Sequence, residues 1–146
     1  MALLDHKQRS ARGSALQAEV CAAPAPMPAT PLEESLRDFV YAEVWNRPGL
    51  DRRSRYLVSL AGAVLAGADA DMVRAYARGA LQGGHLTLGE LREAALHLAV
   101  YGGWSRGQQL DRAVTGAAED LGLDPAACAP IRGEDWDPDE IGRAHV

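Results

Sequence analysis

The stretch TLGELREAALHLAVYGGW, from Thr87 to Trp104, predicts a helix with a well-marked beginning and end. Thr87 followed by Glu90 has the capping-box spacing, in which two side chains satisfy free backbone N–H groups of the first turn. The pair Gly102-Gly103 is expected to break or kink the chain after it. This helix therefore gives a fixed reference from which to interpret the rest of the chain.

One polar stripe runs along this helix. At about 100° per residue, its members fall within roughly an 80° sector, and the remaining circumference is mostly Leu, Ala and Val. The stripe consists of Glu90, Glu93, His97, Tyr101 and Trp104. A helix that is apolar on its other faces is expected in the protein interior, where polar groups must be paired or line a wet cavity.

Two interpretations of the stripe compete, and a third, metal binding, is weaker. Glu93, His97 and Tyr101 are spaced one turn apart, so they can hydrogen-bond to each other and to a neighbouring helix or subunit. Alternatively they line a small-molecule pocket, because a carboxylate one turn from an imidazole favours its protonated form and allows proton transfer near neutral pH. Metal binding is not predicted, since Glu-x-x-x-His supplies only two ligands.

The fold class predicted from periodicity is all-α, with five or six helices. Helical patterns cover approximately residues 3–20, 32–45, 51–67, 69–81, 87–104 and 105–121, and no strand-like alternation of any length interrupts them. The predicted organisation is an N-terminal helix and proline-rich connector over residues 1–31, a helical domain over residues 32–122, and an acidic tail over residues 123–146. The one aromatic side chain of that tail is Trp136.

Composition excludes several classes of function. The 146 residues suffice for one core, and a formal charge of -5 argues against binding nucleic acid. Cys21 and Cys128 are far apart and form no CxxC motif, which indicates neither a redox pair nor a zinc ribbon. No apolar run approaches the ~18 residues that span a bilayer, and residues 1–10 have no apolar core of a signal peptide. We therefore expect a cytoplasmic protein that does not bind membranes.

Arginines mark a second helix, predicted from Asp51 to about Gly67. Arg52 and Arg55 lie with Ser59 on one face of an otherwise small and apolar helix. An arginine held in a helical core usually faces a carboxylate. That carboxylate is either Glu90 or Glu93 of this chain or belongs to a bound substrate.

Four motifs of this chain resemble the carboxymuconolactone decarboxylase family, of the alkylhydroperoxidase D-like superfamily. They are VWNRPGLDRRSR (44–55), GAL (79–81), ELRE (90–93) and AVYGG (99–103), and their order and spacing fit over roughly residues 33–121. The resemblance implies an all-α, alkylhydroperoxidase D-like helical bundle that assembles into homo-oligomers, trimers or hexamers. It also implies a cofactor-free pocket for a small-molecule substrate near the subunit boundaries.

The chain departs from that pattern at chemically important positions. Where the superfamily's peroxidases resemble thiol enzymes with CxxC followed by histidine, this chain has Asp69, Met72 and Tyr76. Thiol peroxidase chemistry is therefore not expected. The lactone decarboxylases of the family keep the histidine that Tyr76 replaces, and His97 stands where many members have glutamine or another small polar residue. An imidazole is thus relocated to the neighbouring helix.

These residues lead to a functional hypothesis with two alternatives. We expect a cofactor-independent, decarboxylase-like lyase acting on a carboxylated lactone, enone or aromatic compound; no glycine-rich nucleotide loop is present in the sequence. Arg55, and more weakly Arg52, is expected to bind the anionic group of the substrate. His97, tuned by Glu93, is expected to protonate carbon, and Tyr101 and Tyr76 to donate hydrogen bonds to the developing oxyanion. Trp104 is expected to contact the substrate. The alternatives are an isomerase, dehydratase or cyclase of a natural-product pathway, and a non-catalytic oligomer that binds a ligand.

Overall fold

The computed structural model describes residues 4–128, and within this range it is entirely helical. Its elements are α1 (His6–Cys21), α2 (Pro31–Ser35), η1 (Leu36–Val44), α3 (Arg52–Leu65), α4 (Ala70–Gln82), α5 (Leu88–Gly102) and α6 (Trp104–Asp120). The predicted all-α bundle is confirmed. None of the described helices combines the length and the apolar character needed to cross a membrane. Trp136 lies outside the described residues, and the predicted division at residues 31 and 122 stays a prediction.

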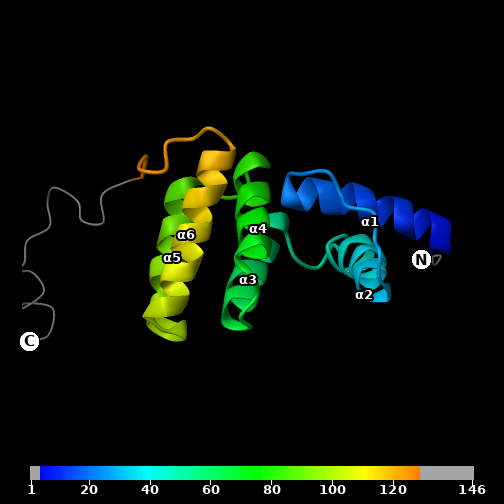
Figure 1. The fold of residues 1–146 in the computed structure, drawn as a ribbon, viewed down its shortest axis with the longest axis horizontal. Coiled ribbons are helices and arrows are strands. Elements are labelled where there is room, and N and C mark those ends of the chain that lie inside the picture. Colours follow the sequence, from blue (N-terminus) through cyan, green and yellow to red (C-terminus); the bar gives the residue numbers. More distant parts are fainter. Residues whose placement is uncertain (1–3, 129–146) are drawn as a thin grey trace, which may run out of the picture.

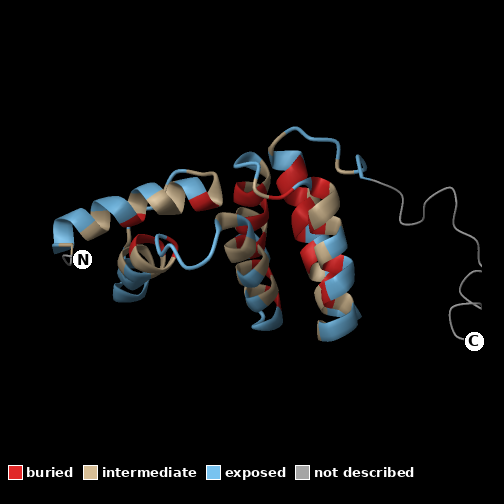
Figure 2. Ribbon diagram, turned by 180° about the vertical axis from the view of Figure 1, so that it is seen from behind, coloured by how far each residue is buried: buried red, intermediate tan, exposed pale blue. Residues whose placement is uncertain are grey.

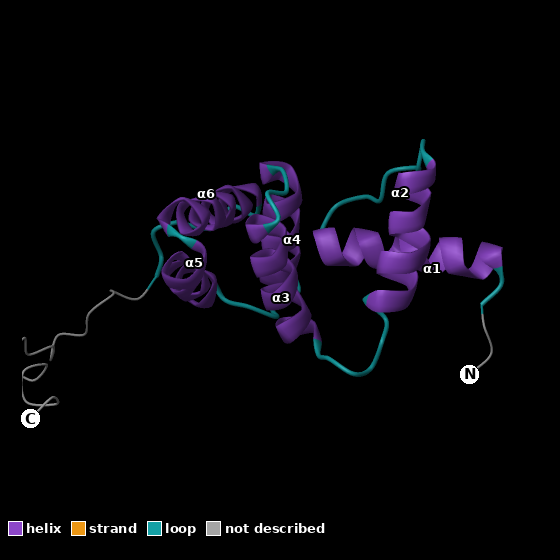
Figure 3. Cartoon of the chain, turned by 90° about the horizontal axis from the view of Figure 1, so that it is seen from below, coloured by secondary structure: helices purple, strands orange, loops and turns teal. Residues whose placement is uncertain are grey.

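The helices form two adjoining groups (Figure 1). Helices α3, α4, α5 and α6 pack side by side, with α4 in contact with α6 and α5 in contact with α6. On the other side of α4, helix α1 carries the continuous α2–η1 helix, which crosses α1 in Figure 3. Buried residues collect where α3 and α4 face α5 and α6, and again where α1 meets η1 (Figure 2).

The helix boundaries follow from local side-chain chemistry. At the start of α5, Thr87 Oγ1 accepts from the Glu90 backbone N–H at 3.2 Å and Glu90 Oε2 accepts from the Thr87 N–H at 2.9 Å, so the predicted capping box is confirmed. Asp51 caps α3 as expected, through the backbone N–H of Ser54. Gly103 separates α5 from α6 with a φ of +95°, a conformation that other residues rarely adopt.

Helix η1 is a π-helix, which changes the face that it buries. The Trp45 N–H donates to the Val40 carbonyl, five residues back, at 2.9 Å. The wider turn brings Tyr41 and Trp45 to the inner face, where both are buried. Phe39, which α-helical spacing would place on the apolar side of the predicted helix over residues 32–45, is 63% exposed. The 3.6-residue period does not apply to this π-helical segment.

Helix α5 is less buried than its apolar composition predicts. Leu91, Ala95 and Leu98 face the core, but Val100 is 76% exposed and Leu96 is also exposed. In the single chain, therefore, the expected interior position holds for one side of α5 and is wrong for the other. An apolar surface of this kind is typical of contact sites between proteins.

The end of α1 is held by side chains of α3 and α4. The carbonyl groups of the last turn of a helix lack partners within that helix. Tyr56 Oη donates to the Val20 carbonyl at 2.8 Å, and Arg78 Nε donates to the Cys21 carbonyl at 3.1 Å. Gly79 on α4 lies directly against Val20, and a Cβ at this position would overlap the Val20 carbonyl. Close approach of α1 and α4 therefore requires glycine at position 79.

We predict that Gly79→Ala lowers the free energy of unfolding by about 1–3 kcal/mol, because the added methyl group forces α1 away from α4. Gly62→Ala is the matched control in the last turn of α3, where an added Cβ meets nothing within 4 Å. It should be neutral or stabilise by up to about 1 kcal/mol through helix propensity. Chemical denaturation measures both, and equal effects of the two substitutions would contradict the tight contact.

Candidate functional site

The predicted catalytic residues of α5 share one face, and that face is open in the single chain. Glu93, His97 and Tyr101 are all exposed, Tyr101 to 79%, and the rings of His97 and Tyr101 lie 5.0 Å apart. Trp104, at the start of α6, is 69% exposed. The stripe thus keeps the predicted arrangement, but its own chain does not enclose it.

Tyr76 belongs to a second, buried group of polar side chains. Its hydroxyl lies 3.3 Å from that of Tyr41, which in turn lies 3.4 Å from Cys21 Sγ. The Trp45 ring stacks on Tyr76 with centroids 5.9 Å apart. Burial raises the pKa of Tyr76, and the hydrogen bond with Tyr41 opposes that rise. Tyr76 therefore remains a neutral phenol near neutral pH and can act as a hydrogen-bond donor.

Arg52 lies next to this buried group and shares Trp45 as a neighbour. Its guanidinium carbon is 5.8 Å from the Trp45 ring centroid, and its Nη2 is 3.7 Å from Glu19 Oε1. Its other terminal nitrogen, Nη1, is buried and has no hydrogen-bond partner among the described residues. A buried N–H without an acceptor is unfavourable, so this nitrogen is suited to an anionic ligand.

Arg55, the stronger candidate for anion binding in the sequence, is engaged by its own chain. Its Nε donates to the Leu50 carbonyl at 3.1 Å and its Nη2 donates to the Arg47 carbonyl at 2.6 Å. These bonds hold the turn that precedes α3. A substrate would therefore have to compete with two backbone acceptors, and Arg52 is the better placed of the two arginines.

The anticipated pairing of Arg52 or Arg55 with a carboxylate of α5 does not occur. Glu90 is paired instead with Arg53, whose Nη1 lies 2.8 Å from Glu90 Oε2. This ion pair, with the Thr87 backbone N–H, lowers the pKa of Glu90 to about 2. Periodicity missed Arg53 because the pair forms at the rim between α3 and α5 and not inside the bundle.

The predicted site residues thus form two groups within one chain. Glu93, His97, Tyr101 and Trp104 lie on the outer side of α5 and the start of α6, whereas Arg52 and Tyr76 lie where α3 and α4 meet η1. No hydrogen bond, ion pair or ring contact between the described side chains joins the two groups. Any chemistry that uses both groups needs a further surface to bring them together.

Sequence reasoning missed the neighbours of Tyr76. Cys21, Tyr41 and Trp45 contact or surround it, yet none was predicted as a site residue. The available signal was the spacing of Leu36, Tyr41 and Trp45, which suits the wide turn of a π-helix and not an α-helix. Such helices occur frequently at functional sites, although they are rare.

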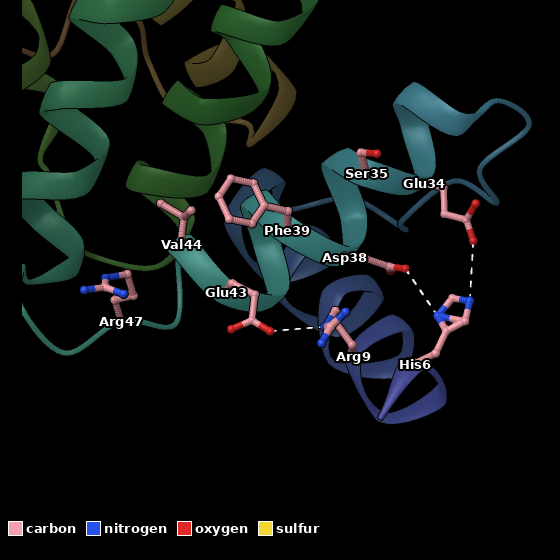
Figure 4. A pocket seen from close by; sticks show the side chains of 9 residues that line it. All are labelled: His6, Arg9, Glu34, Ser35, Asp38, Phe39, Glu43, Val44 and Arg47. Carbon is pink, nitrogen blue, oxygen red and sulfur yellow. Dashed lines mark hydrogen bonds and ion pairs between the residues drawn. The ribbon is translucent and has the colours of Figure 1, made fainter. Parts of the chain in front are cut away.

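An open hollow of about 680 Å³ lies between α1 and η1 (Figure 4). Charged side chains of both signs line it, and Figure 4 shows His6 between Glu34 and Asp38 and Arg9 paired with Glu43. The donor atoms of His6, Glu34 and Asp38 lie within 4.8 Å of one another, as in a metal site. However, Arg37 already donates to Asp38 at 2.6 Å, and its positive charge opposes a cation there. We interpret this trio as an ion-pair cluster.

The fold and these residues identify a class of protein. A sequence model of the carboxymuconolactone decarboxylase family matches residues 18–116, and the chain belongs to this family. The resemblance stated from sequence motifs is thereby confirmed. The matched range includes the end of α1, so it contains Cys21 and Tyr41 as well as the α5 stripe.

Two proteins with similar sequences are named as decarboxylases. Over 87 residues the chain is 34% identical to 4-carboxymuconolactone decarboxylase of Acinetobacter baylyi, with 60% of this chain and 63% of the relative covered. Over 73 residues it is 40% identical to nitrosuccinic acid decarboxylase of Metarhizium robertsii, with 50% of each covered. The chain therefore spans between half and just under two thirds of the length of these curated relatives.

We predict that the Arg53–Glu90 pair stabilises the fold only where Glu90 is ionised. The pKa of Glu90 is lower in the folded protein, about 2, than its ordinary value of 4.5. The stabilisation is therefore fully present above about pH 4.5 and is lost as the pH falls toward about 2. A double-mutant cycle with Arg53→Gln and Glu90→Gln, measured by urea denaturation, should show coupling at about pH 7 that shrinks across this range. Coupling independent of pH would contradict the assignment.

Proposed function

We propose that this protein is a decarboxylase that removes CO2 from a carboxylated small molecule. Membership of the carboxymuconolactone decarboxylase family supports the reaction type, and the names of both relatives describe the loss of a carboxyl group. The substrate in the first name is a carboxylated lactone, and the substrate in the second is a carboxylated nitro compound. We infer a substrate whose lactone, conjugated carbonyl or similar group can accept the electron pair that CO2 leaves behind.

The observation that carries the proposal is the buried Nη1 of Arg52, which has no hydrogen-bond partner within residues 4–128 and lies beside Trp45 and the Tyr41–Tyr76 pair. In this proposal Arg52 binds a carboxylate of the substrate in a site of low polarity, where a charge-assisted hydrogen bond is strong. The stacked rings of Trp45 and Tyr76 provide apolar surface for the carbon skeleton.

The proposed reaction has two steps and needs no oxidant. The C–C bond to the carboxylate breaks, CO2 leaves, and its electron pair passes into the adjoining electron-accepting group of the substrate. Tyr76 donates a hydrogen bond to the oxygen that gains this charge. His97, one turn from Glu93 on α5, then delivers a proton to carbon and takes up another from solvent. Tyr101 and Trp104 contact the substrate from the same face.

The two groups of residues suggest that the site is completed by assembly. We propose a cytoplasmic homo-oligomer, a trimer or hexamer as the family resemblance implies, in which the α5 face of one copy lies against another copy. The exposed apolar side chains Leu96, Val100 and Tyr101 support an interface there. The α5 stripe would then be enclosed and could act together with Arg52 and Tyr76.

The first test is release of CO2 from 4-carboxymuconolactone and from nitrosuccinate, with a small panel of carboxylated aromatic compounds. We expect turnover by the wild-type protein, a loss of roughly 10²-fold or more in kcat in His97→Ala, and a similar loss in Tyr76→Phe. Arg52→Met should chiefly raise KM, whereas Arg12→Gln, an exposed arginine of α1, is the control expected to leave turnover unchanged. The proposal is refuted if the folded, oligomeric protein releases CO2 from none of these compounds. It is also refuted if the protein rearranges one of them without loss of CO2.

The proposed assembly is tested separately. We expect Val100→Glu to reduce the molar mass in solution toward that of one chain, because it places a charge in an apolar interface. Met27→Glu changes an apolar side chain in the connector that is even more exposed, and should leave the mass unchanged. Light scattering after size-exclusion chromatography measures both variants. A wild-type protein that is already monomeric would refute the interface.

A further inference from the structure

Three side chains from three helices meet in a row at the junction of α1, η1 and α4. Cys21 ends α1, Tyr41 lies in the π-helix η1, and Tyr76 lies in the middle of α4. The distances along the row are 3.4 Å from Cys21 Sγ to Tyr41 Oη and 3.3 Å from Tyr41 Oη to Tyr76 Oη. Each group carries a single proton, and either member of each pair can be the donor.

As a continuous chain, in which Tyr41 both donates one hydrogen bond and accepts the other, the row can point in one of two directions. In the first, Tyr76 donates to Tyr41 and Tyr41 donates to the sulfur, so the weak S–H donor is left unused. In the second, Cys21 donates to Tyr41 and Tyr41 donates to Tyr76, so the strong O–H donor of Tyr76 is free. Both directions contain two hydrogen bonds, but the first leaves the weaker donor unpaired and is favoured without a ligand.

An acceptor beside Tyr76 reverses that preference. A negatively charged oxygen that accepts from Tyr76 adds a strong, charge-assisted hydrogen bond to the second direction only. Tyr76 then donates to this oxygen while its own oxygen still accepts from Tyr41, and the aligned bonds reinforce one another. Reversal needs only rotation of the S–H and O–H groups, so no proton passes from one residue to another.

We propose that Cys21 and Tyr41 are positioning residues that form a reversible hydrogen-bond chain, turning the Tyr76 hydroxyl toward the substrate as negative charge develops on it. This inference rests on the proposed function and deepens it by adding two residues outside the predicted site. Tyr76 keeps 7% of its surface exposed, whereas its neighbours Val73 and Ala77 on α4 have none.

The titration behaviour of the row agrees with this role. Burial raises the pKa of the Cys21 thiol, so the sulfur keeps its proton and can serve as a donor. Burial also raises the pKa of Tyr41, with the Cys21 and Tyr76 groups acting in the same direction. Both positioning residues thus remain protonated near neutral pH, as reversal requires. The hydrogen bond from Tyr41 alone acts to make Tyr76 more acidic.

Infrared spectroscopy of the S–H stretch tests the chain without a rate measurement. In a Cys128→Ala, His97→Ala background, Cys21 is the only thiol and turnover of the bound substrate is slowed. We expect the band of the ligand-free protein at the position of a weakly bonded S–H, little changed by Tyr41→Phe, and a shift to lower wavenumber on saturation with 4-carboxymuconolactone. A ligand-free band already at the hydrogen-bonded position, which moves up in Tyr41→Phe, would overturn the proposed resting direction.

Kinetics test the consequence for catalysis. We expect Cys21→Ala and Tyr41→Phe each to lower kcat roughly three- to ten-fold with little change in KM, and Cys21→Ser to retain kcat because its hydroxyl replaces the donor. A structural role alone would not be restored by serine. Turnover that is equal in the wild type, Cys21→Ala and Tyr41→Phe refutes the chain and leaves the proposed function standing. Absence of turnover in the wild type refutes the proposed function, while the ligand-free infrared comparison still decides the direction of the chain.

Discussion

The contact between the end of α1 and the glycine at position 79 of α4 is the constraint on which the remaining arrangement depends. Only glycine leaves room for the Val20 carbonyl, and that carbonyl is satisfied by the Tyr56 hydroxyl from α3. Because η1 packs chiefly on α1, this contact also holds η1 against the bundle. Cys21 and Tyr41 reach Tyr76 as a consequence. The requirement for glycine at position 79 therefore helps to bring Cys21, Tyr41 and Tyr76 into one buried row.

The predictable part of the fold is the part controlled by local chemistry. The capping box at Thr87, the cap at Asp51 and the break at Gly103 each depend on residues within one turn, and all three occur as expected. Phe39 shows where local periodicity fails. Its exposure follows from hydrogen bonds in η1 to carbonyl groups five residues back, which the sequence indicates only through the spacing of Leu36, Tyr41 and Trp45.

The candidate site was predictable only along a single helix. Glu93, His97 and Tyr101 share a face because helical geometry requires it, and the rings of His97 and Tyr101 do lie close together. The arginines of α3 differ because their partners come from elsewhere in the chain. Arg55 binds two loop carbonyls, and Arg53 takes the carboxylate that was expected to pair with its neighbours. Sequence spacing predicts the helix face on which an arginine lies, but not the group that accepts its hydrogen bonds.

The two groups of site residues differ in the environment that their chemistry requires. An arginine that binds a carboxylate and a phenol that stabilises developing charge both act more strongly away from water. Tyr76 is buried, and Nη1 of Arg52 is buried beside the same group. An imidazole that protonates carbon must instead exchange protons with solvent between turnovers, and His97 lies on the open face. A second copy that covers most of that face would shield the substrate from water during bond cleavage. If the cover is incomplete at His97, a proton from solvent can still reach the imidazole. The proposed oligomer thus reconciles a dry binding group with a proton donor that water must reach.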